Sequence, residues 1–142
     1  MKKINIIVVG ASGKMGQAII KETLDDSDLN LAMAIDIKTS PRIGKDAGEL
    51  LGFESNIKIS SDLVLDKSQA DILIDFTRPE ASMKYLDFCE KNNLGYVLKH
   101  FHQFLKQLHD YSSVELSFLS VIPFSLFLTA LKYAALLKGS YS

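Results

Sequence analysis

The chain has few of the features that mark secreted or nucleic-acid-binding proteins. Among its 142 residues there is a single cysteine, Cys89, which excludes an internal disulfide. Cys89 lies in a helical pattern and is expected to be a small buried hydrophobe. Sixteen lysines and arginines stand against 17 aspartates and glutamates, so the formal charge is −1. Without an excess of basic residues to neutralise phosphates, the sequence predicts no nucleic-acid partner.

The sequence also predicts neither a signal peptide nor a full-length membrane span. Residues 1–10 contain too short an apolar run and no small-residue cleavage site, so we expect a cytoplasmic protein. Residues 116–131 carry no charge, but they are interrupted by Pro123 and fall short of the ~20 residues that cross a bilayer. A buried strand and helix, or a misfolding-prone segment, is favoured there over a membrane anchor.

Apolar runs and helical patterns alternate over the first 98 residues, and 47% of the chain is hydrophobic, enough for one domain core. This alternation predicts an α/β fold, a doubly wound, Rossmann-like parallel sheet with helices on both faces and ligands outside the carboxyl ends of the strands. One short helical turn is expected within the loop 37–56. The expected strands are 4–9, 29–36, 57–60, 71–77 and 95–98, and the expected helices are 14–24, with Met15, Ala18, Ile19 and Thr23 inward, 63–69 and 79–91.

Three glycines directly after the first strand form the most informative motif, "VVGASGKMG". Gly10 permits a sharp turn, Gly13 lets the backbone approach a pyrophosphate, and Gly16 allows close packing of helix and strand. The phosphates would meet free N–H groups at the positive end of the helix dipole. The first spacing is one residue wider than the usual dinucleotide fingerprint. The candidate cofactor contacts of this loop are Gly10, Ala11, Ser12, Gly13, Lys14, Met15 and Gly16.

An acidic residue, Asp36, closes the second expected strand twenty residues after Gly16. A carboxylate at this place is expected to accept hydrogen bonds from the adenine ribose. The alternative is an aspartate that only caps a helix or a loop. Because Lys38 and Arg42 are close enough to offset the repulsion of a 2′-phosphate, the choice between NADH and NADPH stays open.

A second group of candidates follows the strand 71–77. Phe76, Thr77 and Arg78 are expected at the carboxyl edge beside the glycine loop, where Phe76 would pack on the cofactor and Arg78 would reach its phosphates or ribose. In the alternative, Thr77 and Pro79 only start a helix and Arg78 is solvated.

Together these motifs resemble the 4-hydroxy-tetrahydrodipicolinate reductase family, also called dihydrodipicolinate reductase. The resemblance rests on "VVGASGKMG", on "GKDAGELLG" from Gly44 to Gly52 and on "DFTRPEAS" from Asp75 to Ser82, and it covers residues 1 to about 98. It implies reduction of a cyclic dipicolinate precursor by NADH or NADPH in the diaminopimelate route to lysine. It also implies that the loop 10–16 binds the pyrophosphate, that Asp36 contacts the ribose, and that Phe76, Thr77 and Pro79 face the cofactor.

The chain departs from the family pattern after residue 98. Lys99, His100, Phe101 and His102 stand where the family has a Gly-Thr-Thr-Gly loop that contacts nicotinamide and substrate. "PFSLF" then keeps Phe124, Ser125 and Leu126 of a later family segment but not its flanking Asn and Gly. The family's substrate domain has no counterpart, so a dipicolinate-type substrate is expected only if that domain is supplied. The pattern resembles a truncated remnant of a gene with reading-frame damage.

The resulting expectation is a dinucleotide-binding domain over residues 1–125, family-like to about 98, followed at 126–142 by the start of a segment leading to a substrate domain. No catalytic residue is assigned, and a metal site at His100, His102 and His109 is weighed and set aside. The chain is expected to bind a dinucleotide without catalysing reduction alone. The alternative is a non-catalytic binding or interaction fragment that docks onto a reductase subunit, since the family is commonly tetrameric and a homo-oligomer is an open expectation.

Overall fold

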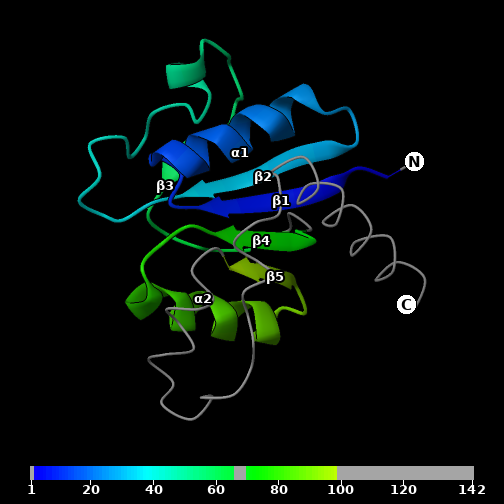
Figure 1. Ribbon diagram of the computed structural model, residues 1–142, viewed down its shortest axis with the longest axis vertical. Coiled ribbons are helices and arrows are strands. Elements are labelled where there is room, and N and C mark those ends of the chain that lie inside the picture. Colours follow the sequence, from blue (N-terminus) through cyan, green and yellow to red (C-terminus); the bar gives the residue numbers. More distant parts are fainter. Residues whose placement is uncertain (1, 66–69, 99–142) are drawn as a thin grey trace, which may run out of the picture. The chain divides into compact units, whose positions relative to one another are not determined.

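The computed structural model describes residues 2–65 and 70–98, all within the unit Met1–Lys99. Figure 1 shows one parallel sheet with the strand order β3-β2-β1-β4-β5. This order and the two helices confirm the predicted doubly wound α/β fold, whose direction of winding reverses between β1 and β4. The strands are β1 (Ile4–Val9), β2 (Leu29–Ile35), β3 (Ile59–Ser60), β4 (Ile72–Asp75) and β5 (Gly95–Leu98).

The central strand, β1, explains the apolar run at its place in the sequence, which is unbroken over residues 6–9. It pairs with β2 on one side and β4 on the other, and the four residues 6–9 are 0% exposed. A strand buried on both faces has no solvent side on which polar residues would alternate. In the register, Val9 pairs with both Ile35 and Asp75, so these three strands end at the same edge.

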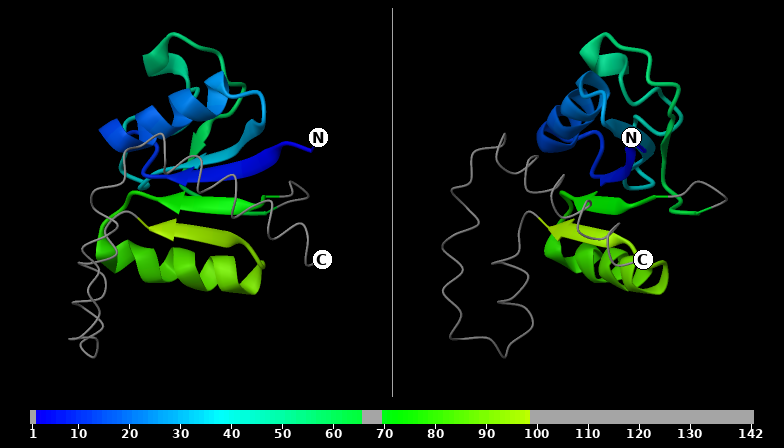
Figure 2. Two further views of the ribbon diagram at one scale, coloured as in Figure 1. Left: turned by 45° about the vertical axis from the view of Figure 1, so that its right-hand side comes forward. Right: turned by 90° about the vertical axis from the view of Figure 1, so that its right-hand side faces the viewer.

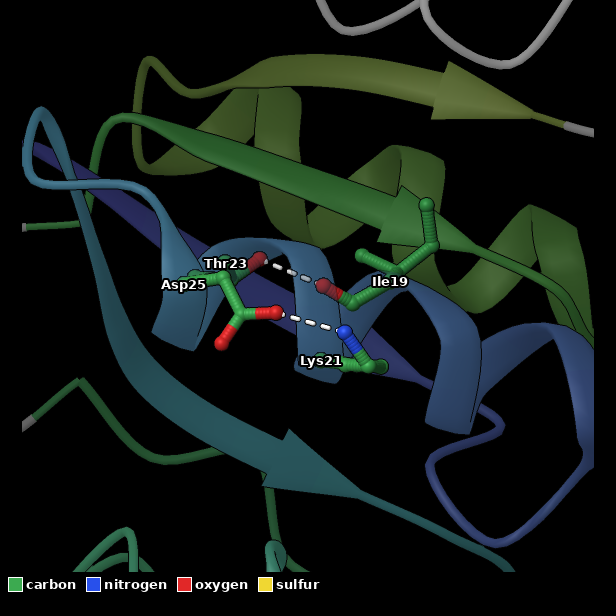
Figure 3. A network of polar contacts seen from close by, with 4 residues as sticks. All are labelled: Ile19, Lys21, Thr23 and Asp25. Carbon is green, nitrogen blue, oxygen red and sulfur yellow. Dashed lines mark hydrogen bonds and ion pairs between the residues drawn. The ribbon is translucent and has the colours of Figure 1, made fainter. Parts of the chain in front are cut away.

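Two helices cover the sheet, α1 (Lys14–Asp25) after β1 and α2 (Pro79–Lys91) after β4. The connections β1–α1–β2 and β4–α2–β5 run in opposite directions along the sheet, so right-handed crossovers place the two helices on opposite faces. In Figure 3, α1 lies in front of the sheet and α2 behind it. Pro79 occupies the first turn of α2, as predicted, and Cys89 on the same helix is 1% exposed. The expected bounds 14–24 and 79–91 are therefore confirmed to within one residue.

The inward face of α1 agrees with the predicted one at Ile19 and Thr23, leaves Ala18 half-buried, and differs from the prediction at Met15. Met15 is 36% exposed, and the buried residues are Gly16, Gln17, Ile19, Ile20 and Thr23. Positions 16, 19, 20 and 23 recur at the helical spacings of three and four, and Met15 lies one position off this stripe. Buried Thr23 donates its hydroxyl to the Ile19 carbonyl at 2.7 Å, whereas Lys21 and Asp25 form an exposed ion pair at 2.6 Å (Figure 3).

The segment between β2 and β3 contains the expected short helical turn, the 3₁₀ helix η1 (Glu49–Leu51), which lies beside α1 in Figures 1 and 2. Strand β3 is shorter than the predicted strand 57–60. The predicted helix 63–69 is wrong for residues 63–65, which are not helical, and its remainder lies outside the described residues. Every expectation about residues 99–142, including the domain boundary at 125, also lies outside the described residues. Among residues 2–65 and 70–98, neither α1 nor α2 could span a lipid bilayer.

Candidate functional site

The carboxyl ends of β1 and β4 meet where the winding reverses. The Phe76 N–H donates to the Val9 carbonyl at 3.1 Å, which holds the residue after β4 against the end of β1. Gly10 has a φ of +83°, a conformation that L side chains rarely adopt, and a Cβ there would lie 3.4 Å from Phe76. The turn predicted from the first glycine is therefore present, and it lies beside the predicted Phe76 segment.

The other two glycines of the loop have different surroundings. A Cβ on Gly16 would lie 2.1 Å from the Gly10 carbonyl oxygen, so the helix packs against the loop too closely for any other residue. A Cβ on Gly13 would meet only that same oxygen at 3.4 Å. Gly16 thus has the predicted packing role, while Gly13 keeps the outer surface of the loop free of side-chain atoms.

Gly13 is the N-cap of α1, and no side chain caps this helix end. The first turn also lacks an acidic residue, and Lys14 and Met15 are exposed there. The first N–H groups of a helix have no partner within the helix, and the dipole makes this end positive. The start of α1 therefore offers backbone donors and a favourable potential to an anion such as a pyrophosphate.

Asp36 lies directly after β2 and reaches the glycine loop. Its Oδ2 accepts the Ser12 N–H at 2.9 Å, and its Oδ1 accepts the Ile37 N–H at 2.8 Å. These contacts are what the loop-capping alternative describes. A carboxylate has about four acceptor positions, so these two bonds leave room for ribose hydroxyls.

Ser40 and Arg42 follow Asp36 along the chain, and Ser12 contacts Asp36 through its backbone N–H. The Ser12 and Ser40 Oγ atoms are 3.1 Å apart, and the Arg42 N–H donates to the Ser40 Oγ at 3.3 Å. The Arg42 Nε is buried and has no hydrogen-bond partner among the described residues. The surroundings of Asp36 thus combine a carboxylate, which disfavours a 2′-phosphate, with hydroxyls and a cation, which favour one.

A buried carboxylate, that of Asp75, lies under the turn that follows β4. The side chain is 0% exposed, and its Oδ1 accepts the Thr77 N–H at 2.7 Å and the Thr77 hydroxyl at 2.6 Å. Its Oδ2 accepts the Tyr96 hydroxyl at 2.7 Å. Burial, followed by the hydrogen bond to Asp75 and the charge of that carboxylate, raises the pKa of Tyr96 well above its ordinary value. Tyr96 is therefore a donor at every physiological pH.

The structure brings most of the predicted cofactor residues to one edge of the sheet. The loop 10–16, Asp36 and the turn at Phe76 and Thr77 follow β1, β2 and β4, whose ends are in register. Arg78 is exposed at the N-cap of α2 and donates no side-chain cap bond. Its position agrees with the solvated alternative.

Sequence reasoning missed three polar residues that support this edge, namely Gln17, Asp75 and Tyr96. Gln17 is 8% exposed, and its Nε2 donates to the Ala11 carbonyl at 2.7 Å and approaches the Ala47 carbonyl at 3.4 Å. It thereby links the glycine loop to the second motif. The sequence could have pointed to Asp75, because it is a charged residue at the end of the apolar run "ILID". No such signal in the sequence marks Gln17 or Tyr96.

The second motif, "GKDAGELLG", forms a turn around Asp46. The Asp46 Oδ1 accepts the Gly48 N–H at 2.8 Å, the Ser55 N–H at 3.0 Å and the Ser55 hydroxyl at 2.8 Å. Burial acts to raise the pKa of Asp46, but these hydrogen bonds outweigh it and hold the pKa below its ordinary value. The motif is thus a structural turn that presents buried Ala47 to Gln17.

No group of three metal-ligating side chains occurs among residues 2–65 and 70–98. The histidines weighed as a metal site, His100, His102 and His109, lie outside the described residues, as does Lys99.

Comparison with known proteins agrees with this geometry. The family model for the N-terminus of dihydrodipicolinate reductase matches residues 4–99. The chain is 44% identical over 98 residues to a 4-hydroxy-tetrahydrodipicolinate reductase of Herminiimonas arsenicoxydans, covering 69% of this chain and 37% of that protein. It is 41% identical over 98 residues to the enzyme of the same name from Dechloromonas aromatica, with the same coverage of both chains.

A third relative, from Burkholderia lata, is 42% identical over 95 residues, which are 67% of this chain and 36% of the relative. The matched part of the chain thus spans less than two fifths of the length of these relatives. The family model covers more than half of the chain, including the whole described sheet and all three motifs. The chain therefore belongs to the dihydrodipicolinate reductase family.

Proposed function

We propose that this chain binds NADH or NADPH across the carboxyl edge of its sheet and serves the reduction for which its relatives are named. The observation that carries the proposal is the start of α1, which has no side-chain cap and directly continues the glycine loop at Gly13. The open surface at Gly13 fits a pyrophosphate, since a side chain there would stand between the backbone donors and the anion.

The strand order supports an assignment for each part of the dinucleotide. The loop after β1 holds the pyrophosphate, and Asp36 after β2 accepts the adenine ribose hydroxyls. The turn at Phe76 and Thr77, after β4 on the other side of β1, then meets the nicotinamide half. When bound, the reduced cofactor supplies hydride, and the residues of this chain bind and orient it.

Three further statements complete the proposal. A dipicolinate-type substrate is proposed for the reaction as the relatives' names suggest it. An oligomer is proposed because members of the family are commonly tetrameric. Light scattering on the purified chain measures its oligomeric state. The reduction is proposed to require groups beyond the described sheet, because the residues found here are suited to binding the cofactor.

A calorimetric titration with NADH and with NADPH tests the proposal. We expect saturable binding of at least one of them by the chain and weaker binding by Gly13→Ala, whose new Cβ meets nothing closer than 3.4 Å in the protein itself. Equal binding by both proteins, or none by either, contradicts the proposal. Reductase turnover is measured in parallel, and robust turnover by this chain alone contradicts the statement that further groups are needed.

The non-catalytic alternative keeps the same binding site and differs in what the bound cofactor is used for. The low coverage of the relatives, 37% of their length, favours testing it. Co-purification of the chain with a full-length reductase subunit, measured by mass photometry, would support it. A chain that runs separately from that subunit at every concentration would contradict it.

A further inference from the structure

Asp75 lies at a position where the sheet itself does not require a charge. In the register it pairs with Val9 on β1 and with Leu98 on β5, both apolar. The three residues before it, 72–74, are apolar and buried, and the Asp75 side chain is 0% exposed. Burying a carboxylate is unfavourable unless hydrogen bonds satisfy it, so an apolar residue would serve the core better. Packing of the core therefore does not explain why a carboxylate is present at this position.

Its hydrogen bonds join two elements at the carboxyl edge. Oδ1 takes both donors of Thr77 and so closes the turn after β4, in the side-chain-to-backbone pattern of an Asx turn. Oδ2 takes the hydroxyl of Tyr96, which belongs to β5 and also lies 3.2 Å from the Ser82 carbonyl on α2. Within the described part of the chain, neither of the two ion pairs includes Asp75. The carboxylate is thus held by donors on both sides.

The consequence for Thr77 is specific. Its N–H and its hydroxyl proton both point to Asp75, so the hydroxyl presents lone pairs rather than its proton to the outside. Phe76, the residue between them, is fixed from the other side by its N–H bond to Val9. The turn is therefore fixed at each of its residues before any ligand arrives.

We infer that Asp75 and Tyr96 are positioning residues that set the turn at Phe76 and Thr77 for the nicotinamide half of the dinucleotide. This inference rests on the proposed function, which assigns that turn to the nicotinamide side of the site. Tyr96 restrains the carboxylate, the carboxylate orients Thr77, and neither Asp75 nor Tyr96 touches the cofactor. The raised pKa of Tyr96 fits this role, because a neutral phenol keeps donating at every working pH.

The test separates the two halves of the ligand. ADP carries the adenosine and both phosphates, and so reports on the glycine loop and Asp36 alone, whereas NADH also engages the turn after β4. For Tyr96→Phe, which removes one hydroxyl and keeps the ring, we expect the Kd of NADH to rise about tenfold and that of ADP to change less than about twofold. Both constants are measured by calorimetry.

Tyr85→Phe is the matched control, because Tyr85 is a buried tyrosine of α2 in the core cluster against which Tyr96 packs. It should leave both dissociation constants within about twofold of wild type, since Asp75 takes its hydrogen bonds from Thr77 and Tyr96. The inference is overturned if Tyr96→Phe weakens the binding of NADH and ADP by the same factor, or if it leaves the affinity for NADH unchanged. If wild type binds neither NADH nor ADP, the proposed function itself fails.

A measurement on the wild-type chain covers the case in which Tyr96→Phe does not fold. In the chain without ligand, hydrogen exchange at the Thr77 amide should already be slow, because its N–H is bonded to the buried Asp75 carboxylate. Fast exchange at this amide in the free chain contradicts the inference without any substitution.

Discussion

Replacing Gly16 by alanine tests the closest contact between α1 and the glycine loop. The added Cβ would lie 2.1 Å from the Gly10 carbonyl oxygen and 2.9 Å from its carbon. Even close carbon–oxygen contacts are about 3.3 Å, so the overlap exceeds ~1 Å. Both neighbours are backbone atoms, which do not rotate away as a side chain would. The helix start and the loop must therefore separate.

Such overpacking costs about 1–3 kcal/mol, and the better helix propensity of alanine returns at most ~1 kcal/mol. We expect a net loss of about 1–2 kcal/mol, which lowers the Tm of a domain of roughly 100 residues by about 4–16 °C. NADH affinity should fall as well, because the displaced Gly10 turn borders the binding loop. Urea unfolding followed by circular dichroism, together with calorimetric NADH titration, measures the two effects.

Gly13→Ala is the control for this prediction. Its Cβ would meet the Gly10 oxygen at 3.4 Å and its φ is −71°, so the substitution fits the fold and stability should change by less than about 1 kcal/mol. The reasoning is refuted if Gly16→Ala is as stable as wild type, or if Gly13→Ala loses as much stability as Gly16→Ala.

Three further substitutions probe single interactions. Asp36→Ala should weaken the binding of NADH more than that of NADPH, because it removes a carboxylate that repels a 2′-phosphate. The ratio of the two dissociation constants should shift by at least about fivefold. An unchanged ratio in calorimetry speaks against a ribose contact. Asp46→Asn should be less stable than wild type at neutral pH, since the lowered pKa of Asp46 makes the charged carboxylate stabilising above its ordinary value of 3.8. As the pH falls below that value through the folded-state pKa the difference should shrink, and urea midpoints that keep a constant gap from pH 7 to 3 would contradict this. Thr23→Val removes the hydroxyl bonded to the Ile19 carbonyl but keeps the shape, so the unfolding free energy should change by less than about 1 kcal/mol; a larger loss in urea titrations would show that the bond dominates.

The elements that sequence reasoning predicted well are those with strong, local signals. The run at Ile4–Val9 is apolar at nearly every position because β1 is buried on both faces, and Pro79 marks the start of α2 by its fixed φ and missing N–H. The placement of the loop glycines and Asp36 at one edge of the sheet could be predicted from their spacing, because the ends of parallel strands in register bring them together.

The failures concern choices that only tertiary contacts decide. Met15, predicted to point inward, is exposed and Gln17 is buried, because the contact of Gly16 with the Gly10 turn sets the rotation of α1. Residues 63–65 have a helical pattern but are not helical, and local propensity is often overridden in this way. Tyr96 and Asp75 are 21 residues apart, and no sequence period connects them.

In the proposed binding mode, a dinucleotide lies across the carboxyl ends of β2, β1 and β4. Amide chemical-shift mapping by NMR during titration with NADH tests this most directly. We expect the largest shifts at residues 10–16, at Asp36 and Ile37, and at residues 76–78, with small shifts at the opposite edge near Leu29 and Asp71. Shifts confined to that opposite edge, or no shifts at saturating NADH, would contradict the claim.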